Sequence, residues 1–256
     1  MRRLAVPNLL RLIYRNFRVN TDPASLIILL GLPAMYLVFF GFGFGSLAGA
    51  GSTAYLAFLA PGIMAFQSIM AGTVGGSMLW ADRRYGMLAQ LLVGPFSRLE
   101  YLFGIMLTAL LFGLGGAAIM LAISVVLVAP AGLTLAGALG AFGAIALGSI
   151  FFGSLMLLIS ALVKSNNAYN SIQVLVIFFV NFASTVFYPY STSLPAGIRG
   201  LFLANPLTYV ADTARSGLGG TLSAHNGLEM VVLAVETIVL LMLATRAYMR
   251  ADVTSE

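Results

Sequence analysis

Long apolar runs alternate with short polar segments along the whole chain. Each run passes the test of about 20 residues that a helix needs to cross a bilayer. The pattern therefore predicts an all-α membrane protein with six transmembrane helices in a single domain. We place these helices near Ala24–Phe44, Tyr55–Leu79, Tyr101–Val128, Leu135–Val163, Ala168–Phe187 and Leu228–Tyr248.

The first twenty residues show an amphipathic pattern instead. Arg11, Arg15 and Arg18 share one face of a helix through their spacing of four and three residues. The other face is apolar and consists of Leu9, Leu10, Ile13, Tyr14 and Phe17. Residues 1–20 are therefore predicted to form an interfacial helix on the cytoplasmic leaflet.

The basic residues set the orientation of the helices. With the N-terminus in the cytoplasm, all but Arg199 and Arg215 of the 13 Lys and Arg residues lie on the cytoplasmic side. Lys and Arg are enriched in the cytoplasmic loops of membrane proteins. Both termini are therefore predicted to be cytoplasmic.

Composition agrees with this class of protein. The 256 residues are 60% hydrophobic and 8% charged, with a mean hydropathy of +1.00, which is typical of a polytopic membrane protein. The net charge of +5 does not indicate a nucleic-acid partner, because the basic residues are not gathered on a soluble domain. The chain has no cysteine and one histidine, His225, so neither a disulfide nor a metal site is predicted.

A concentration of charge lies between the second and third apolar runs. Leu88, Leu91 and Leu92 recur there at helical spacing, and Gly94 and Pro95 end the pattern. The result is a short amphipathic helix whose apolar face must dock on the bilayer surface or on a soluble partner. The charges predict that the stretch Ala81–Leu102 lies in water; they are Asp82, Arg83, Arg84, Arg98 and Glu100.

The segment Tyr188–Gly227 is too long for a turn and too apolar for a free loop. Asn205 and Pro206 fit the N-cap and first position of a helix. We predict two short external helices that lie on the outer leaflet or dip into it. The alternative is a surface helical hairpin with no gating role.

Polar residues within the apolar runs are candidates for a translocation path. A stripe on the fifth run steps along one helical face, and Gln67 begins a weaker one on the second run with Ser68, Thr73 and Ser77. Such faces meet other helices or water, so the alternative is interhelical hydrogen bonding that only holds the bundle. The fifth-run stripe consists of Asn170, Gln173, Asn181, Ser184 and Tyr188.

Glu236, near the middle of the sixth run, is costly to bury unpaired. It could contact a substrate or a proton, or it could be a neutral acid bonded to a neighbouring helix.

Two motifs carry a resemblance to a known family. The string from Arg84 to Arg98, RYGMLAQLLVGPFSR, followed by Gly104, resembles the cytoplasmic coupling loop of ABC-2 exporter permeases. Asn205-Pro206-Leu207-Thr208-Tyr209-Val210, with Asp212, Arg215 and Gly219, is similar to the segment before the last span of that family. The chain departs from the loop pattern at Ala89, where the family often has an acidic residue.

This resemblance implies specific roles for the motif residues. Asn205, Pro206 and Tyr209 would belong to an external gate, and the second and fifth spans would flank a dimer axis. Arg83, Arg84 and Arg98 would contact an ATPase, although they could instead anchor to anionic headgroups. The residues implied to couple the chain to an ATPase are Arg83, Arg84, Tyr85, Gly86, Leu88, Leu91, Leu92, Pro95 and Arg98.

The resemblance also implies a function. The chain would be the transmembrane subunit of an ATP-driven exporter in the inner or plasma membrane of a prokaryote, paired with a second permease copy. Two copies of a cytosolic ATPase would hold the ATP and Mg²⁺, because this chain lacks a G-x-x-x-x-G-K-[ST] string, binds no cofactor and is not an enzyme. The substrate would be an amphipathic or lipid-linked molecule. Two alternatives stay open: a proton-coupled secondary transporter that uses Glu236, and a membrane-embedded enzyme or scaffold.

Overall fold

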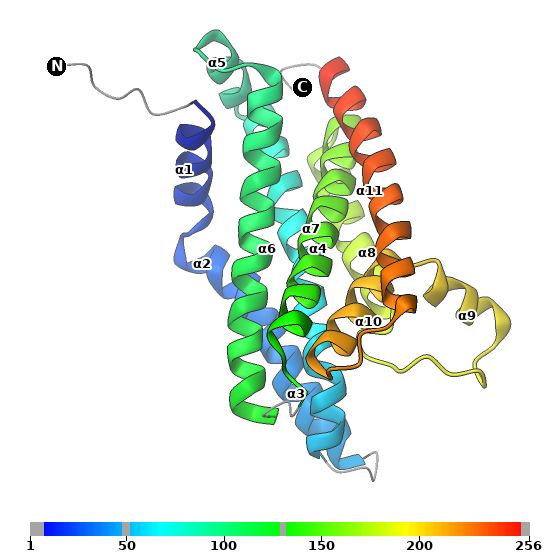
Figure 1. The fold of residues 1–256 in the computed structure, drawn as a ribbon. Coiled ribbons are helices and arrows are strands. Elements are labelled where there is room, and N and C mark those ends of the chain that lie inside the picture. The colour runs from blue at the N-terminus through cyan, green and yellow to red at the C-terminus, as the bar shows by residue number, and fades with distance from the viewer. Residues whose placement is uncertain (1–7, 48–51, 129–131, 252–256) are drawn as a thin grey trace.

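The computed structural model describes residues 8–47, 52–128 and 132–251, and within these ranges its regular secondary structure is helical, with no strand (Figure 1). Arg2, Arg3 and parts of two predicted external loops lie outside the described residues. The elements are α1 (Asn8–Asn20), α2 (Pro23–Leu26), the π-helical segment η1 (Ile27–Gly31), α3 (Leu32–Leu47), α4 (Ser52–Arg84), α5 (Met87–Val93), α6 (Arg98–Val128), α7 (Leu135–Leu162), α8 (Asn166–Phe182), α9 (Ala196–Leu203), α10 (Pro206–Leu218) and α11 (Ala224–Arg250).

Five helices in the described ranges are long and apolar enough to cross a membrane. They occupy residues 23–43, 54–84, 98–128, 135–162 and 224–250. The predicted span Ala168–Phe187 is wrong at its end, because α8 has 17 residues and stops at Phe182. Side chains satisfy the carbonyl groups there: Ser184 donates to the carbonyl oxygen of Asn181, and Asn205 donates to those of Val180 and Ala183.

α4 is the centre of the bundle. In its most apolar window 78% of residues are buried, compared with 22% in the spans 23–43 and 224–250. It packs most extensively on α7 and α6. Glycines permit the close approach to α7, since a Cβ at Gly72 would lie 2.6 Å from the carbonyl carbon of Phe152 and one at Gly76 would lie 2.5 Å from Cβ of Met156.

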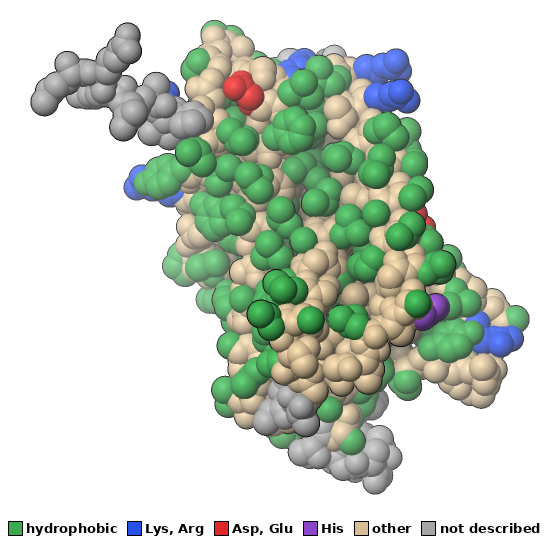
Figure 2. Space-filling view, in the orientation of Figure 1, with side chains coloured by type: hydrophobic (Ala, Val, Ile, Leu, Met, Phe, Trp, Pro, Cys, Tyr) green, Lys and Arg blue, Asp and Glu red, His purple; other side chains and the backbone are tan. Residues whose placement is uncertain are grey.

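Charge is concentrated at one end of the bundle. Figure 2 shows Lys and Arg side chains beside α1 and at the end where α5 and the last turns of α11 lie, with a separate group beside α9. Apolar side chains cover the surface between these two regions. This is the distribution that the positive-inside rule describes, and we refer to the α5 end as the coupling end.

Candidate functional site

The short helix predicted between the second and third apolar runs is confirmed as α5. α4 ends at Arg84, and Gly86 has φ 69°, a left-handed conformation that costs glycine little. The chain turns at this glycine, begins α5 at Met87 and leaves it at Gly94, whose N–H bonds back to the carbonyl oxygens of Gln90 and Leu91.

The apolar face of α5 packs against the chain itself. Leu88 is 1% exposed, and Leu91 and Leu92 are half-buried against the same cluster, which includes Leu102 of α6 and Tyr248 of α11. The ends of neighbouring helices therefore cover Leu88, whereas Leu91 and Leu92 are covered only in part, and contact of this face with the bilayer or a soluble partner stays a prediction.

The other side of α5 faces outward. Tyr85 is 75% exposed and Val93 is 91% exposed. Apolar side chains exposed to this degree at a charge-rich end are typical of a contact surface. Helical periodicity identifies the buried leucines, so sequence analysis missed Met87, Gln90 and Val93. We call the outward set the docking surface; it consists of Arg84, Tyr85, Met87, Gln90 and Val93.

Two of the predicted coupling arginines bind helix ends within the chain. Arg83 is 4% exposed and donates to the carbonyl oxygens of Ser160 (2.5 Å) and Ala161 (3.4 Å) at the end of α7. Arg98 donates in the same way at the end of α11, to Tyr248 and Met249, at 3.2 and 3.1 Å. A cation at a helix C-terminus satisfies free carbonyl groups and the helix dipole. The prediction that Asp82 and Arg83 lie in water is wrong.

A partly buried ion pair connects α1 to the last turn of α4. Both Nη atoms of Arg15 bond to the carboxylate of Asp82, and the Tyr101 hydroxyl of α6 donates to the same carboxylate at 2.7 Å. Burial alone would lower the pKa of Arg15, but the hydrogen bond and charge of Asp82 outweigh it, so the pKa is raised. Sequence analysis placed Arg15 on the basic face of an interfacial helix, because Asp82 is 67 residues away along the chain.

The face that α1 turns to the bundle is only partly the predicted apolar one, which contributes Phe17 stacked on Phe112 with ring centres 4.7 Å apart. Leu12 and Asn16 are each 1% exposed, and Asn16 donates to the Thr108 hydroxyl at 3.2 Å. Gly104 leaves room for this contact, since a Cβ there would lie 3.1 Å from Cβ of Leu12. Of the predicted apolar face, Leu10 and Tyr14 are exposed. The position of α1 on a membrane leaflet stays a prediction.

The structure brings together part of the predicted polar path. Gln173 of α8 and Ser77 of α4 are within hydrogen-bonding distance (3.3 to 3.5 Å), and both line a cavity of about 220 Å³ with Thr73. Asn20 and Ser25 lie on its other wall. The cavity has neutral polar groups and apolar walls, which suits an uncharged hydrogen-bonding group.

The other predicted path residues lie apart from this cavity. Gln67 is fully buried against Gly116 of α6, and its amide has no partner among the described residues. Asn181 and Ser184 are buried where α8 ends. Asn170 and Tyr188 are exposed. A common path through all of them would require the helices to move.

The two predicted short helices before the last span are confirmed as α9 and α10. Asn205 caps α10, because its Oδ1 accepts from the backbone N–H of Leu207 at 3.0 Å, and Pro206 takes the first helical position. The Tyr209 hydroxyl donates to the carbonyl oxygen of Leu203 at 2.6 Å and closes the turn between the helices. A gating role for this turn stays a prediction.

Asn205 serves two helices at once, which gives a first testable expectation. Asn205→Ala should lower the free energy of unfolding by about 2 kcal/mol, because α10 loses its cap and two carbonyl groups of α8 lose their donor. Asn205→Asp keeps the capping oxygen but places a carboxylate oxygen where the donor faced two carbonyl oxygens, so it should cost at least as much as the alanine variant. Thermal unfolding in detergent measures both, and equal stability of the alanine variant and the parent would contradict the double role.

A polar cluster toward the end of the bundle opposite α5 (Figure 1) was not predicted as a site. Arg215 donates to Asp212 (2.6 Å) and to the carbonyl oxygen of Thr185 (2.9 Å), and its guanidinium lies 3.9 Å from the ring centre of Phe58. Burial lowers the pKa of Arg215, while the charge of Asp212 opposes that shift. The cluster holds α10 against α4 and the end of α8. The feature of the sequence that could have indicated this cluster is the i, i+3 spacing of Asp212 and Arg215, which permits an ion pair on one helix.

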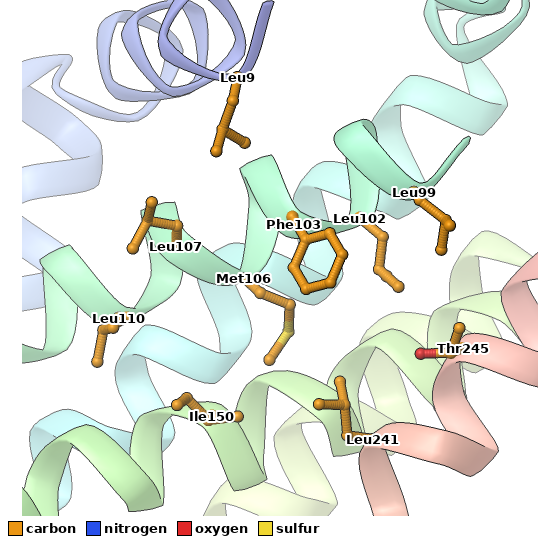
Figure 3. Close-up of a pocket in the computed structure, with 10 residues that line it drawn as sticks. All are labelled: Leu9, Leu99, Leu102, Phe103, Met106, Leu107, Leu110, Ile150, Leu241 and Thr245. Atoms are coloured by element: carbon orange, nitrogen blue, oxygen red, sulfur yellow. The ribbon is translucent and has the colours of Figure 1, made fainter. Parts of the chain in front are cut away.

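An apolar groove of about 330 Å³ lies at the coupling end of the bundle surface (Figure 3). α6 forms most of it through Phe103 and Met106, α7 contributes Ile150, and α11 contributes Leu241 and Thr245. Its walls suit a hydrocarbon chain.

These features define a class: a polytopic helical membrane protein of the transport type, with a short amphipathic helix at one end and a helical hairpin before its last span. The family model described as "ABC-2 type transporter" matches residues 8–218. The chain belongs to that family and is a membrane transport component rather than an enzyme. Membership implies in general terms an ATPase partner and a dimeric arrangement. A search of curated proteins found no match.

Proposed function

We propose that this chain is the transmembrane subunit of an ATP-driven exporter for an amphipathic or lipid-linked substrate. Two copies, or one copy and a related chain, pair around a central path, and two cytosolic ATPase subunits bind below. The observation that carries this proposal is the docking surface, an exposed face of a short helix whose other face is anchored in the bundle core.

In this proposal, the movement of the ATPase on ATP binding is transferred to the permease through α5. Leu88 anchors α5 in a cluster shared with α4, α6 and α11, so a push on α5 moves these helix ends together. Arg15 and Asp82 extend the same unit to α1. The arrangement supports a rigid-body transfer of motion from the coupling end to the bundle.

The substrate class follows from the surfaces available. The cavity beside Ser77 and Gln173 offers uncharged polar groups, and the groove along α6 offers apolar walls. A molecule with a polar head and a hydrocarbon tail matches both chemistries. We also propose that α8, which would extend about 25 Å as a helix, completes a six-span domain with both termini cytoplasmic, in a prokaryotic inner or plasma membrane.

The docking surface can be tested by charge substitution. The double variant Tyr85→Asp/Val93→Asp should weaken association with the ATPase by about tenfold or more, because charge replaces exposed apolar contacts at the centre of the interface. Co-purification and substrate-stimulated ATP hydrolysis in proteoliposomes measure the effect. These positions are preferable to Leu91 and Leu92, whose substitution would also disturb the core.

A matched control is Leu222→Asp, an exposed leucine just before α11 at the opposite end. It should leave association unchanged. Equal ATPase binding and stimulation by the double variant and the parent would remove α5 from the proposed interface.

ATP dependence separates this proposal from proton-coupled transport. A proton pathway needs a series of titratable groups. Glu236, by contrast, forms no hydrogen bond or ion pair with another titratable residue in the described ranges. Transport should therefore stop without ATP and continue when the proton gradient is collapsed; the reverse result would favour the secondary transporter.

A further inference from the structure

A shallow hollow lies on the surface of the bundle beside the middle of α11. It has a volume of about 520 Å³ and opens outward. Phe151 and Leu155 of α7 form one wall, and Ala204 and Pro206 bring the turn between α9 and α10 to its edge. Its other lining residues are apolar side chains of α11 and one carboxylate, Glu236.

Glu236 differs from every other acidic residue that the structure describes. Asp82 and Asp212 are paired with arginines, and Asp22 and Glu100 accept hydrogen bonds from backbone N–H groups. Glu229, two turns earlier on α11, is bonded by Asn226 at 3.1 Å and lies 3.4 Å from His225. Within the described ranges, Oε2 of Glu236 is buried and has no hydrogen-bonding partner.

The hollow thus holds one carboxylate oxygen that has no partner and is surrounded by apolar side chains. A carboxylate is costly to hold there unless a positive charge accompanies it. An anionic ligand would be repelled, and a neutral hydrocarbon would leave the oxygen without a partner. A cation with apolar substituents would satisfy the carboxylate and the walls together.

Aromatic groups near the carboxylate favour the same ligand. Phe151 lines the hollow. Tyr209 does not line the hollow; its pKa is raised first by burial and then by the charge of Glu236. Aromatic faces attract cations through the negative face of the ring quadrupole.

We propose that the hollow beside Glu236 is a binding site for a hydrophobic cation that arrives from the bilayer. The approach is from the outer surface of α11, where Val235 and Val239 are exposed next to the carboxylate. The site shares no lining residue with the cavity beside Ser77 and Gln173. It does not depend on ATP-driven export, since the ligand would bind the permease alone.

Two probes of matched size and opposite charge test the site. Tetraphenylphosphonium and tetraphenylborate would be measured by equilibrium dialysis against the full chain in phosphatidylcholine nanodiscs, with empty nanodiscs as background. The cation should bind saturably at one site per chain and at least tenfold more tightly than the anion. Glu236→Gln should weaken cation binding by about tenfold or more and leave the anion unaffected.

Two further variants keep the result interpretable. Glu229→Gln removes a carboxylate from the same helix that already has partners, so cation binding should not change. Leu155→Trp should fill the hollow and reduce cation binding although Glu236 is intact. Thermal unfolding would confirm that each variant is folded. Equal binding of both probes, or unchanged cation binding by folded Glu236→Gln, would overturn the proposal.

Discussion

Replacing Asp82 with leucine is expected to lower the free energy of unfolding by about 2–3 kcal/mol. The substitution leaves the Arg15 guanidinium without a counter-ion and the Tyr101 hydroxyl without an acceptor. Breaking a fully buried pair costs about 3–5 kcal/mol, and we reduce that figure because the Arg15 side chain is 25% exposed. Thermal unfolding in detergent, followed by the fluorescence of the single tryptophan, measures the loss.

A double-mutant cycle separates the ion pair from simple side-chain loss. Arg15→Leu/Asp82→Leu should be more stable than the sum of the single changes predicts, because neither charge is then left alone. Arg18→Leu, an exposed arginine on the same helix, serves as the control and should have little effect. Additive effects would show that the two side chains act independently.

Gly72→Ala is expected to be the most damaging single substitution among those considered. Its Cβ would lie 2.6 Å from the carbonyl carbon of Phe152 and 2.7 Å from its oxygen. Backbone atoms cannot rotate away, so α4 and α7 must separate along the most extensive contact of the bundle. We expect a loss of about 3 kcal/mol or more and reduced accumulation in the membrane.

Gly143→Ala on α7 is the matched control. No atom lies within 4 Å of a Cβ at that position, and alanine favours the helix. Its stability should be unchanged or slightly higher. If both variants unfold at the same temperature, the contact between α4 and α7 is looser than the structure shows.

Much of the fold could be predicted from local patterns. Hydropathy located the five long apolar helices, although not their precise ends. The leucine spacing located α5, and Asn205-Pro206 located the start of α10. Each of these signals lies within a few residues of the structure that it specifies.

The errors have one physical cause, which is interaction between distant parts of the chain. α8 stops early because Asn205, 22 and 25 residues away, binds the carbonyl groups at its end. Arg83 looks solvent-facing until its acceptors, 77 and 78 residues away, are known. The charge of a residue is visible in the sequence, but the position of its counterpart depends on the packing of the helices.

The bonds from Arg98 to the last turn of α11 have a consequence for biosynthesis. Their acceptors, Tyr248 and Met249, are translated 150 and 151 residues after Arg98. Until then Arg98, in the first turn of α6, lacks these acceptors. The cluster on which Leu88 of α5 packs also lacks Tyr248. The start of α6 and the adjacent α5 can therefore reach their final packing only after α11 has been synthesised.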